Sequence, residues 1–94
     1  MEIVHKNGES DGIFLAQDNG KIVGEMTYIW SGDNNFVINH TAVSGPYQDR
    51  GIGLKMVATA VQYARDNNLT ITPVCSFARG VFNSTPEYND IRKQ

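Results

Sequence analysis

The stretch Val43–Lys55, with the sequence VSGPYQDRGIGLK, lies between an apolar extended run and the long helical pattern of the chain. Gly51 and Gly53 remove side chains where the backbone must approach a bulky group closely. A helix that begins at these glycines leaves its first N–H groups without partners, with the positive end of the helix dipole behind them. We therefore interpret the stretch as a strand–loop–helix that binds a phosphate or diphosphate, with Arg50 and Lys55 adding positive charge.

The glycine spacing alone leaves a second interpretation open, in which the loop only makes a tight turn. The chain lacks the Gly-Lys-Ser/Thr ending of a Walker loop. It also lacks the three glycines and the following acidic residue of a dinucleotide-binding loop. The loop must therefore be judged on the segment Gln48–Gly53, QDRGIG, together with the rest of the chain.

Four runs of strand-forming residues precede the loop. They cover Glu2–His5, Ile13–Ala16, Lys21–Trp30 and Phe36–Val43. The dipeptide Asn19-Gly20 is a favoured two-residue hairpin turn because both residues tolerate a positive φ. Consecutive hairpins at this spacing predict a four-stranded antiparallel meander.

The alternation of side chains predicts which residues share a face of the two longer strands. In the third strand, Ile22 is expected on the same face as Gly24 and Met26. A glycine in mid-strand also indicates a bulge or a close neighbour at Gly24. The fourth strand is expected to place Phe36, Ile38, His40 and Ala42 on one face and Val37, Asn39, Thr41 and Val43 on the other.

Residues 51–67 repeat apolar side chains at helical spacing and predict a helix with one buried stripe. The stripe consists of Ile52, Met56, Val57, Ala60, Val61 and Ala64. A fifth strand over Thr70–Cys75 follows, and a strand–helix–strand connection predicts that the fourth and fifth strands are parallel. The fold class is therefore α+β or α/β, a mixed sheet in which the meander is followed by a β-α-β unit with the phosphate-binding loop.

The two ends of the chain carry weaker signals. A short C-terminal helix is expected over Ser76–Asn83 with Ser76 as its N-cap, and Pro86 can begin another brief helical turn. The segment Arg92–Gln94 is expected to be frayed. At the other end, His5 is expected to be an exposed strand residue without a role.

Composition limits the class of protein. The 94 residues form one domain, 1–94, and the net charge of −2 argues against a protein that mainly binds the nucleic-acid backbone. A single cysteine excludes an internal disulfide, and two histidines with one cysteine offer no cluster for metal catalysis. No apolar run reaches about 18 residues and no signal-peptide pattern occurs. We therefore expect a cytoplasmic protein with no membrane or nucleic-acid partner.

Three segments of the chain carry a resemblance. QDRGIG at Gln48–Gly53 resembles the Q/R-x-x-G-x-G/A signature of the GNAT superfamily of acyl-CoA-dependent N-acetyltransferases. HTAV at His40–Val43 and PVCSF at Pro73–Phe77 are similar to motifs of the short single-domain branch of predicted acetyltransferases in this superfamily. The similarity covers nearly the whole chain. Most members have two helices between their first two strands, and only Asn7–Asp11 lies there, so the acceptor site is expected to be unusually open.

The resemblance implies acetyl-CoA or coenzyme A as the cofactor. In the family, backbone amides of the loop hold the diphosphate of coenzyme A. Carried over to this sequence, the cofactor-binding residues are Val43, Gln48, Asp49, Arg50, Gly51, Ile52, Gly53, Leu54 and Lys55.

The resemblance also implies that His40 and Cys75 form the catalytic pair. In one mechanism His40, or a water that it positions, takes the proton from an amine that attacks the thioester directly. In the other, a nearby base activates Cys75, which accepts the acetyl group and passes it on. A satisfied sheet histidine and a small buried cysteine are the structural alternatives. Tyr88 lies roughly where many members have a tyrosine that protonates the leaving thiolate, but its Pro-Glu-Tyr setting favours packing.

The leading hypothesis is therefore an acetyl-CoA-dependent N-acetyltransferase that acts on an unknown amine, either a small molecule or a protein. A non-catalytic module that binds coenzyme A or acyl-CoA is the first alternative, which the missing helical pair favours. An interaction domain with an empty anion site is the second. For the oligomeric state we expect a monomer or a weak homodimer.

Overall fold

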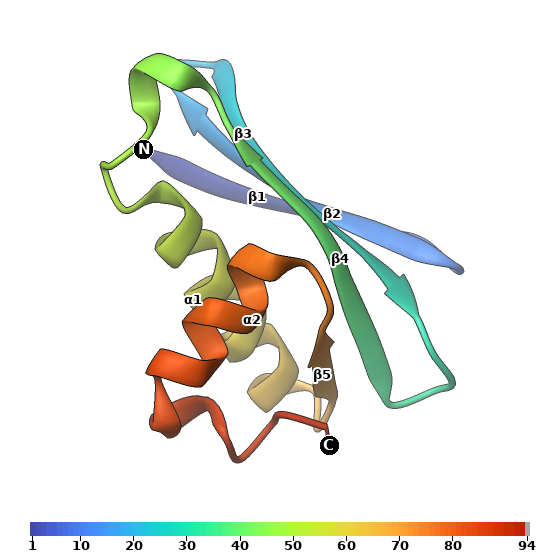
Figure 1. The fold of residues 1–94 in the computed structure, drawn as a ribbon. Helices are drawn as coiled ribbons and strands as arrows, with labels where there is room; N and C mark the ends of the chain where they lie inside the picture. The colour runs from blue at the N-terminus through green and yellow to red at the C-terminus, as the bar shows by residue number, and fades with distance from the viewer. Residues whose placement is uncertain (94) are drawn as a thin grey trace.

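The computed structural model describes residues 1–93 and shows a five-stranded sheet with two α-helices on one of its faces (Figure 1). The elements are β1 Glu2–Asn7, β2 Asp11–Asp18, β3 Lys21–Trp30, β4 Asn35–Val43, the 3₁₀ turn η1 Gly45–Tyr47, α1 Ile52–Asp66, β5 Thr70–Pro73, α2 Ser76–Ser84 and the 3₁₀ turn η2 Pro86–Tyr88. The strands lie in chain order; β1 to β4 pair antiparallel and β5 pairs parallel to β4. The predicted meander and β-α-β unit are confirmed.

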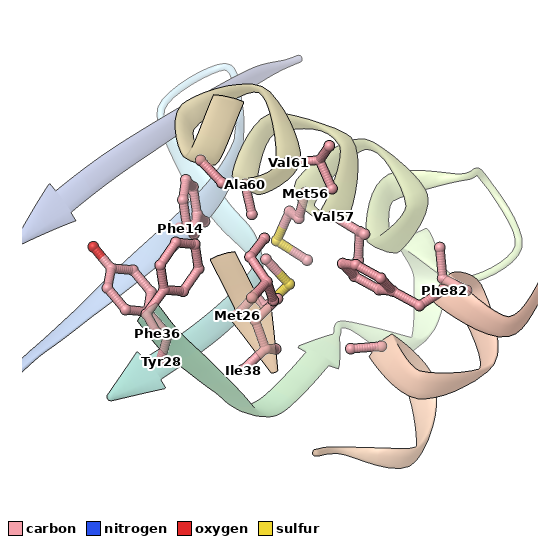
Figure 2. Close-up of a cluster of buried hydrophobic side chains, with 14 of the residues drawn as sticks. Phe14, Met26, Tyr28, Phe36, Ile38, Met56, Val57, Ala60, Val61 and Phe82 are labelled. Carbon is pink, nitrogen blue, oxygen red and sulfur yellow. The ribbon is translucent and has the colours of Figure 1, made fainter. Parts of the chain in front are cut away.

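The core lies between the sheet and α1. Every residue of the predicted helical stripe is buried, and these side chains meet strand residues such as Met26, Phe36 and Ile38 (Figure 2). From α2, Phe82 reaches the same cluster and is also buried. Each fully buried side chain of this size contributes about 1.5–3 kcal/mol to stability. The helices are therefore held on one face, and we call the other face of the sheet the open face.

A β-bulge in β4 changes which side chains share a face. Thr27 pairs with His40 and Tyr28 pairs with Ile38, so Asn39 is an extra residue with no partner on β3. One extra residue reverses the alternation beyond it. The expectation that His40 and Ala42 share the face of Ile38 is therefore wrong: both are exposed, whereas Thr41 lies opposite the buried Met26 on the core side.

A second irregularity lies where β3 begins. Ala16 pairs with Gly24 and Gln17 pairs with Ile22, which leaves Val23 as the extra residue. Val23 is consequently buried and Ile22 is exposed, so the prediction that Ile22 shares a face with Gly24 is wrong. The bulge expected next to Gly24 is confirmed. The close neighbour is also present, since a Cβ on Gly24 would lie 3.3 Å from Met56 Cε of α1.

An aromatic and polar cluster ties β1 to the sheet and to α1. The His5 ring stacks on Phe14 with centroids 4.1 Å apart and meets the Tyr63 ring edge at 4.4 Å. The buried Tyr28 hydroxyl contacts His5 Nε2 and donates to Asn7 Oδ1 at 2.9 Å. The expectation of an exposed His5 without a role is wrong, because its strand register places it beside Phe14 on the core face.

The C-terminal segment joins the sheet. Arg92 forms a parallel bridge with Ile71, and the Lys93 N–H donates to the Ile71 carbonyl at 2.9 Å. The predicted fraying is therefore wrong for Arg92 and Lys93, because the outer edge of β5 offers them a partner; Gln94 lies outside the described residues. None of the helices within residues 1–93 has the length and apolar character needed to cross a membrane.

The His5 cluster predicts an acid-sensitive contribution to stability. Burial lowers the pKa of the His5 imidazole below its ordinary value of 6.5. The unfolded chain therefore binds more protons than the folded protein as the pH falls below 6.5, and the free energy of unfolding decreases over that range. We expect His5→Phe to remove the His5 contribution to this decrease in the free energy of unfolding, which lies between pH 6.5 and the pKa of His5 in the folded protein. Urea unfolding at a series of pH values measures it. A difference between the two proteins that does not change with pH would contradict this.

Two glycines offer a matched pair of stability predictions. A Cβ at Gly12 would lie 2.2 Å from the ring and hydroxyl of the buried Tyr28, so Gly12→Ala should reduce the free energy of unfolding by about 1–3 kcal/mol. In α2 nothing lies within 4 Å of a Cβ at Gly80, so Gly80→Ala should increase the free energy of unfolding by roughly 0.5–1 kcal/mol. Urea unfolding of both variants measures this, and shifts of the same sign would contradict it.

Candidate functional site

A pocket of about 460 Å³ lies where β4 ends and α1 begins. Its walls come from the end of β4, the connecting loop, the first turn of α1 and one side chain of α2. They consist of Thr41, Ala42, Val43, Tyr47, Gln48, Asp49, Gly51, Ile52, Gly53, Leu54 and Phe77. Of the predicted cofactor-binding residues, all except Arg50 and Lys55 line this pocket.

The pocket exists because β4 and β5 part. They pair only from Asn35–Ile38 with Thr70–Pro73, and the Ile38 carbonyl then accepts both the Val74 N–H at 3.0 Å and the Cys75 N–H at 3.1 Å. Beyond that point the chain turns into α2. The rest of β4 therefore has a strand on its β3 side only.

The free edge of β4 presents backbone polar groups to the pocket. The Ser44 N–H donates to the Val23 carbonyl of β3 at 2.8 Å. Backbone groups alternate in direction along an antiparallel strand, so those of Thr41 and Val43 point away from β3. They point toward the gap that opens where β4 and β5 part. Consistent with this, the Val43 carbonyl accepts the Gln48 side-chain amide at 3.2 Å. Such an edge can bind an extended ligand through its backbone groups.

The start of α1 offers unpaired N–H groups to the same pocket. The Lys55 N–H is bonded to the Gly51 carbonyl at 3.0 Å, so those of Ile52, Gly53 and Leu54 precede the first helical bond. No side chain caps the helix and its first turn holds no acidic residue, as far as residues 1–93 show. The free donors and the helix dipole therefore favour an anion here.

The two glycines of the loop serve different purposes. Gly51 has a φ of 76°, which favours glycine, and nothing lies within 4 Å of a Cβ there, so the space in front of the helix stays open. Gly53 has ordinary helical geometry, but a Cβ on it would lie 2.5 Å from Phe77 Cζ. The bulky group next to Gly53 is thus the chain's own Phe77 ring, which forms a wall of the pocket. That contact could not be seen from the sequence, because Phe77 lies on a different helix.

The charged residues of the loop lie at the margin of the pocket. The Arg50 guanidinium lies over the Tyr47 ring, 5.1 Å from its centroid, instead of lining the pocket. Lys55 is exposed on α1. Tyr47 itself lines the pocket and was missed as a site residue, although it stands inside the quoted loop sequence.

His40 and Cys75 are not brought together. The Asn39 bulge turns His40 to the open face, where its Nε2 lies 3.8 Å from Oε2 of Glu25. The Cys75 sulfur instead lies 3.4 Å from the Thr41 hydroxyl. Within residues 1–93, no hydrogen bond or ion pair joins the two predicted catalytic residues.

Cys75 has a defined place at the start of α2. It is the N-cap of that helix, and its half-buried Sγ accepts the Ala78 N–H at 3.4 Å. The prediction that Ser76 is the N-cap is wrong, because β5 ends at Pro73 and the helix begins one residue earlier than expected. Tyr88 packs on Phe82 with ring centroids 5.5 Å apart, which agrees with the packing role favoured above. Over residues 1–93, no three His, Cys, Asp or Glu side chains form a group that could hold a metal ion.

The family model for GCN5-related N-acetyl-transferase matches residues 13–91. The chain belongs to this family. No curated protein sequence gives a significant match. A solution structure of a GCN5-like protein from Staphylococcus aureus, assigned as an N-acetyltransferase, is 34% identical, with 98% of this chain and 87% of that chain covered and a TM-score of 0.73.

Structures with bound cofactor also share the fold. A protein from Bacillus anthracis assigned as a streptothricin acetyltransferase, solved with acetyl coenzyme A, is 26% identical, with a TM-score of 0.59 over 69% of this chain and 38% of that chain. An aminoglycoside N-acetyltransferase in complex with CoA is 10% identical and has a TM-score of 0.70 with 88% of each chain covered. As a member of the GCN5-related family, the protein is an acetyltransferase whose cofactor is acetyl-CoA.

The anion site at Gly51 yields a prediction about cofactor binding. We expect Gly51→Glu to abolish coenzyme A binding, because its carboxylate would fill the open space and repel a diphosphate. Gly51→Asn is the control for the strain of placing a side chain at a φ of 76°, since asparagine tolerates this conformation and is uncharged. Calorimetric titration with coenzyme A measures both variants. Unchanged affinity in a folded Gly51→Glu protein would contradict the assignment of the loop.

Proposed function

We propose that the protein transfers the acetyl group of acetyl-CoA directly to an amine that approaches from the open face of the sheet. The observation that carries this proposal is the parting of β4 and β5 beside the uncapped start of α1. An anion site and a free strand edge then lie in one pocket. The coenzyme A that the family uses has a diphosphate, which suits the anion site. It also has an amide-containing pantetheine arm, which suits the free strand edge.

The residues of the pocket fit this cofactor in detail. The N–H groups of Ile52, Gly53 and Leu54 are available for the diphosphate. The free backbone groups of Thr41 and Val43 can pair with the amides of the pantetheine arm, as a strand would. The acetyl thioester then belongs in the gap between β4 and the start of α2.

His40 is the residue that we propose as the base. It lies on the open face, and its Nε2 faces the Glu25 carboxylate at 3.8 Å, which leaves Nδ1 to take a proton from the acceptor ammonium. The freed nitrogen forms a bond to the thioester carbonyl carbon, the C–S bond breaks, and the acetylated nitrogen gives up a second proton. The departing coenzyme A thiolate takes up this second proton and leaves as the thiol.

A route through Cys75 is the second candidate mechanism. It is favoured by the hydrogen bonds of the sulfur, which accepts the Ala78 N–H at the start of α2 and shares a hydrogen bond with the Thr41 hydroxyl. In this route the sulfur accepts the acetyl group as coenzyme A leaves, and the amine then takes it from the sulfur. Against it stands the position of His40 on the other face, since no basic side chain within residues 1–93 contacts Sγ.

The acceptor is proposed only as a class, an amine on a small molecule or a protein. The names of fold neighbours include aminoglycoside acetyltransferases and a ribosomal-protein-alanine N-acetyltransferase. Within residues 1–93, β1 and β2 are joined by a short connection, and no helical pair lies over the open face. That open access also suits the alternative of a module that binds coenzyme A without catalysis. We further propose that the protein acts in the cytoplasm as a monomer or weak homodimer.

Intact-protein mass spectrometry after incubation with acetyl-CoA separates the two mechanisms. We expect the native protein and the Cys75→Ala variant to show the same acetylation, with no adduct on Cys75, because direct transfer leaves no covalent intermediate. A Cys75-dependent adduct that an added amine removes would contradict direct transfer.

A steady-state assay over a panel of aminoglycosides and peptide N-termini tests His40. We expect His40→Gln to lower kcat by about 10²–10⁴-fold, the usual contribution of a general base, with coenzyme A affinity unchanged as the control. Tight binding of coenzyme A without turnover of any amine would favour the non-catalytic module.

A further inference from the structure

A cluster of two cations on one aromatic ring lies at the loop end of the pocket. The Lys21 Nζ lies 5.9 Å and the Arg50 guanidinium carbon 5.1 Å from the centroid of the Tyr47 ring. Tyr47 lines the pocket together with the adjacent Gln48 and Asp49. Cation–π contact with one ring thus holds two like charges at the same margin of the pocket.

The fold, and not the sequence, brings Lys21 to this place. Lys21 is the first residue of β3, directly after the β2–β3 turn, and lies 26 positions before Tyr47 in the printed sequence. The Ser44 N–H donates to the Val23 carbonyl at 2.8 Å, which fixes the start of β3 beside the end of β4. Figure 1 shows the β2–β3 turn next to the green turn that follows β4.

The two cations have no anionic partner within residues 1–93. The ion pairs of this part of the chain involve other residues, and neither includes Lys21 or Arg50. The nearest acidic residues along the chain are Asp18, which lies opposite Lys21 in the strand register, and Asp49, next to Arg50, and neither forms an ion pair with them. In a protein of net charge −2, two cations that share one ring and form no ion pair within residues 1–93 are available to contact a further anion.

We propose that Lys21, Tyr47 and Arg50 form a subsite for the 3′-phosphate of coenzyme A. This inference rests on the proposed placement of the cofactor in the pocket. If the thioester lies at the gap by Thr41 and the diphosphate at the start of α1, the nucleotide end lies toward Tyr47. There the cofactor carries a second anionic group, the 3′-phosphate on its ribose. Dephospho-CoA lacks this group and matches coenzyme A elsewhere, so the subsite distinguishes the two molecules.

Calorimetric titration with coenzyme A and with dephospho-CoA tests the subsite. We expect the native protein to bind coenzyme A about fivefold more tightly, the size expected of exposed ion pairs. Lys21→Gln should weaken the binding of coenzyme A and leave that of dephospho-CoA unchanged. The preference of the native protein for coenzyme A over dephospho-CoA should decrease as the salt concentration rises. Lys6→Gln, on β1, is the matched control and should leave the preference intact.

Variants of Tyr47 test the role of the ring. Tyr47→Phe keeps the aromatic face and should keep the preference for coenzyme A, whereas Tyr47→Ala should reduce it. Equal affinities of the native protein for both ligands, or equal losses for both in Lys21→Gln, would overturn the subsite while leaving the cofactor assignment in place. No binding of either ligand by the native protein would overturn the cofactor site itself and the subsite with it.

Discussion

The early end of the pairing between β4 and β5 is the constraint on which the rest of the site depends. Strand pairing satisfies backbone N–H and C=O groups, and here it stops after Ile38 and Pro73. Had β5 continued beside β4, the strand edge at Thr41 and Val43 would be covered. The chain instead turns into α2, whose first residues place Phe77 against Gly53 and close one side of the pocket. One interruption in a hydrogen-bond ladder thus creates the gap, its free edge and one of its walls.

The Asn39 bulge adds a second constraint by dividing the polar residues of β4 between the two faces. Thr41 points toward the core side and contacts Cys75, while His40 points toward the open face and faces Glu25. The two sides of the gap therefore have different chemistry. The sulfur is hydrogen-bonded to the Ala78 N–H and the Thr41 hydroxyl, whereas the imidazole lies on the open face beside the Glu25 carboxylate. This separation of His40 from Cys75 is the reason that we propose direct transfer instead of a route through Cys75.

The small core can support this open site because its polar groups are satisfied. Within residues 1–93, every buried side-chain nitrogen and oxygen has a hydrogen-bond partner. The Tyr28 hydroxyl, which would be costly to bury alone, contacts His5 and Asn7, and this contact also fastens the edge strand β1. Gly12 makes room for that ring, so a residue without a side chain is as much a part of the packing as the aromatic rings are.

The sequence by itself determined the elements and the type of site. Periods of two and of 3.6 residues are local signals, so the strands, α1 and its buried stripe could be predicted, and the loop could be identified from a short run of residues. Only the tertiary structure decided which way His40 and Thr41 point, because a bulge is set by the pairing partner and one extra residue reverses a strand. It also decided that Phe77 packs on Gly53 and that Lys21 reaches Tyr47. Those contacts join residues far apart in the chain, and no local pattern of side chains encodes them.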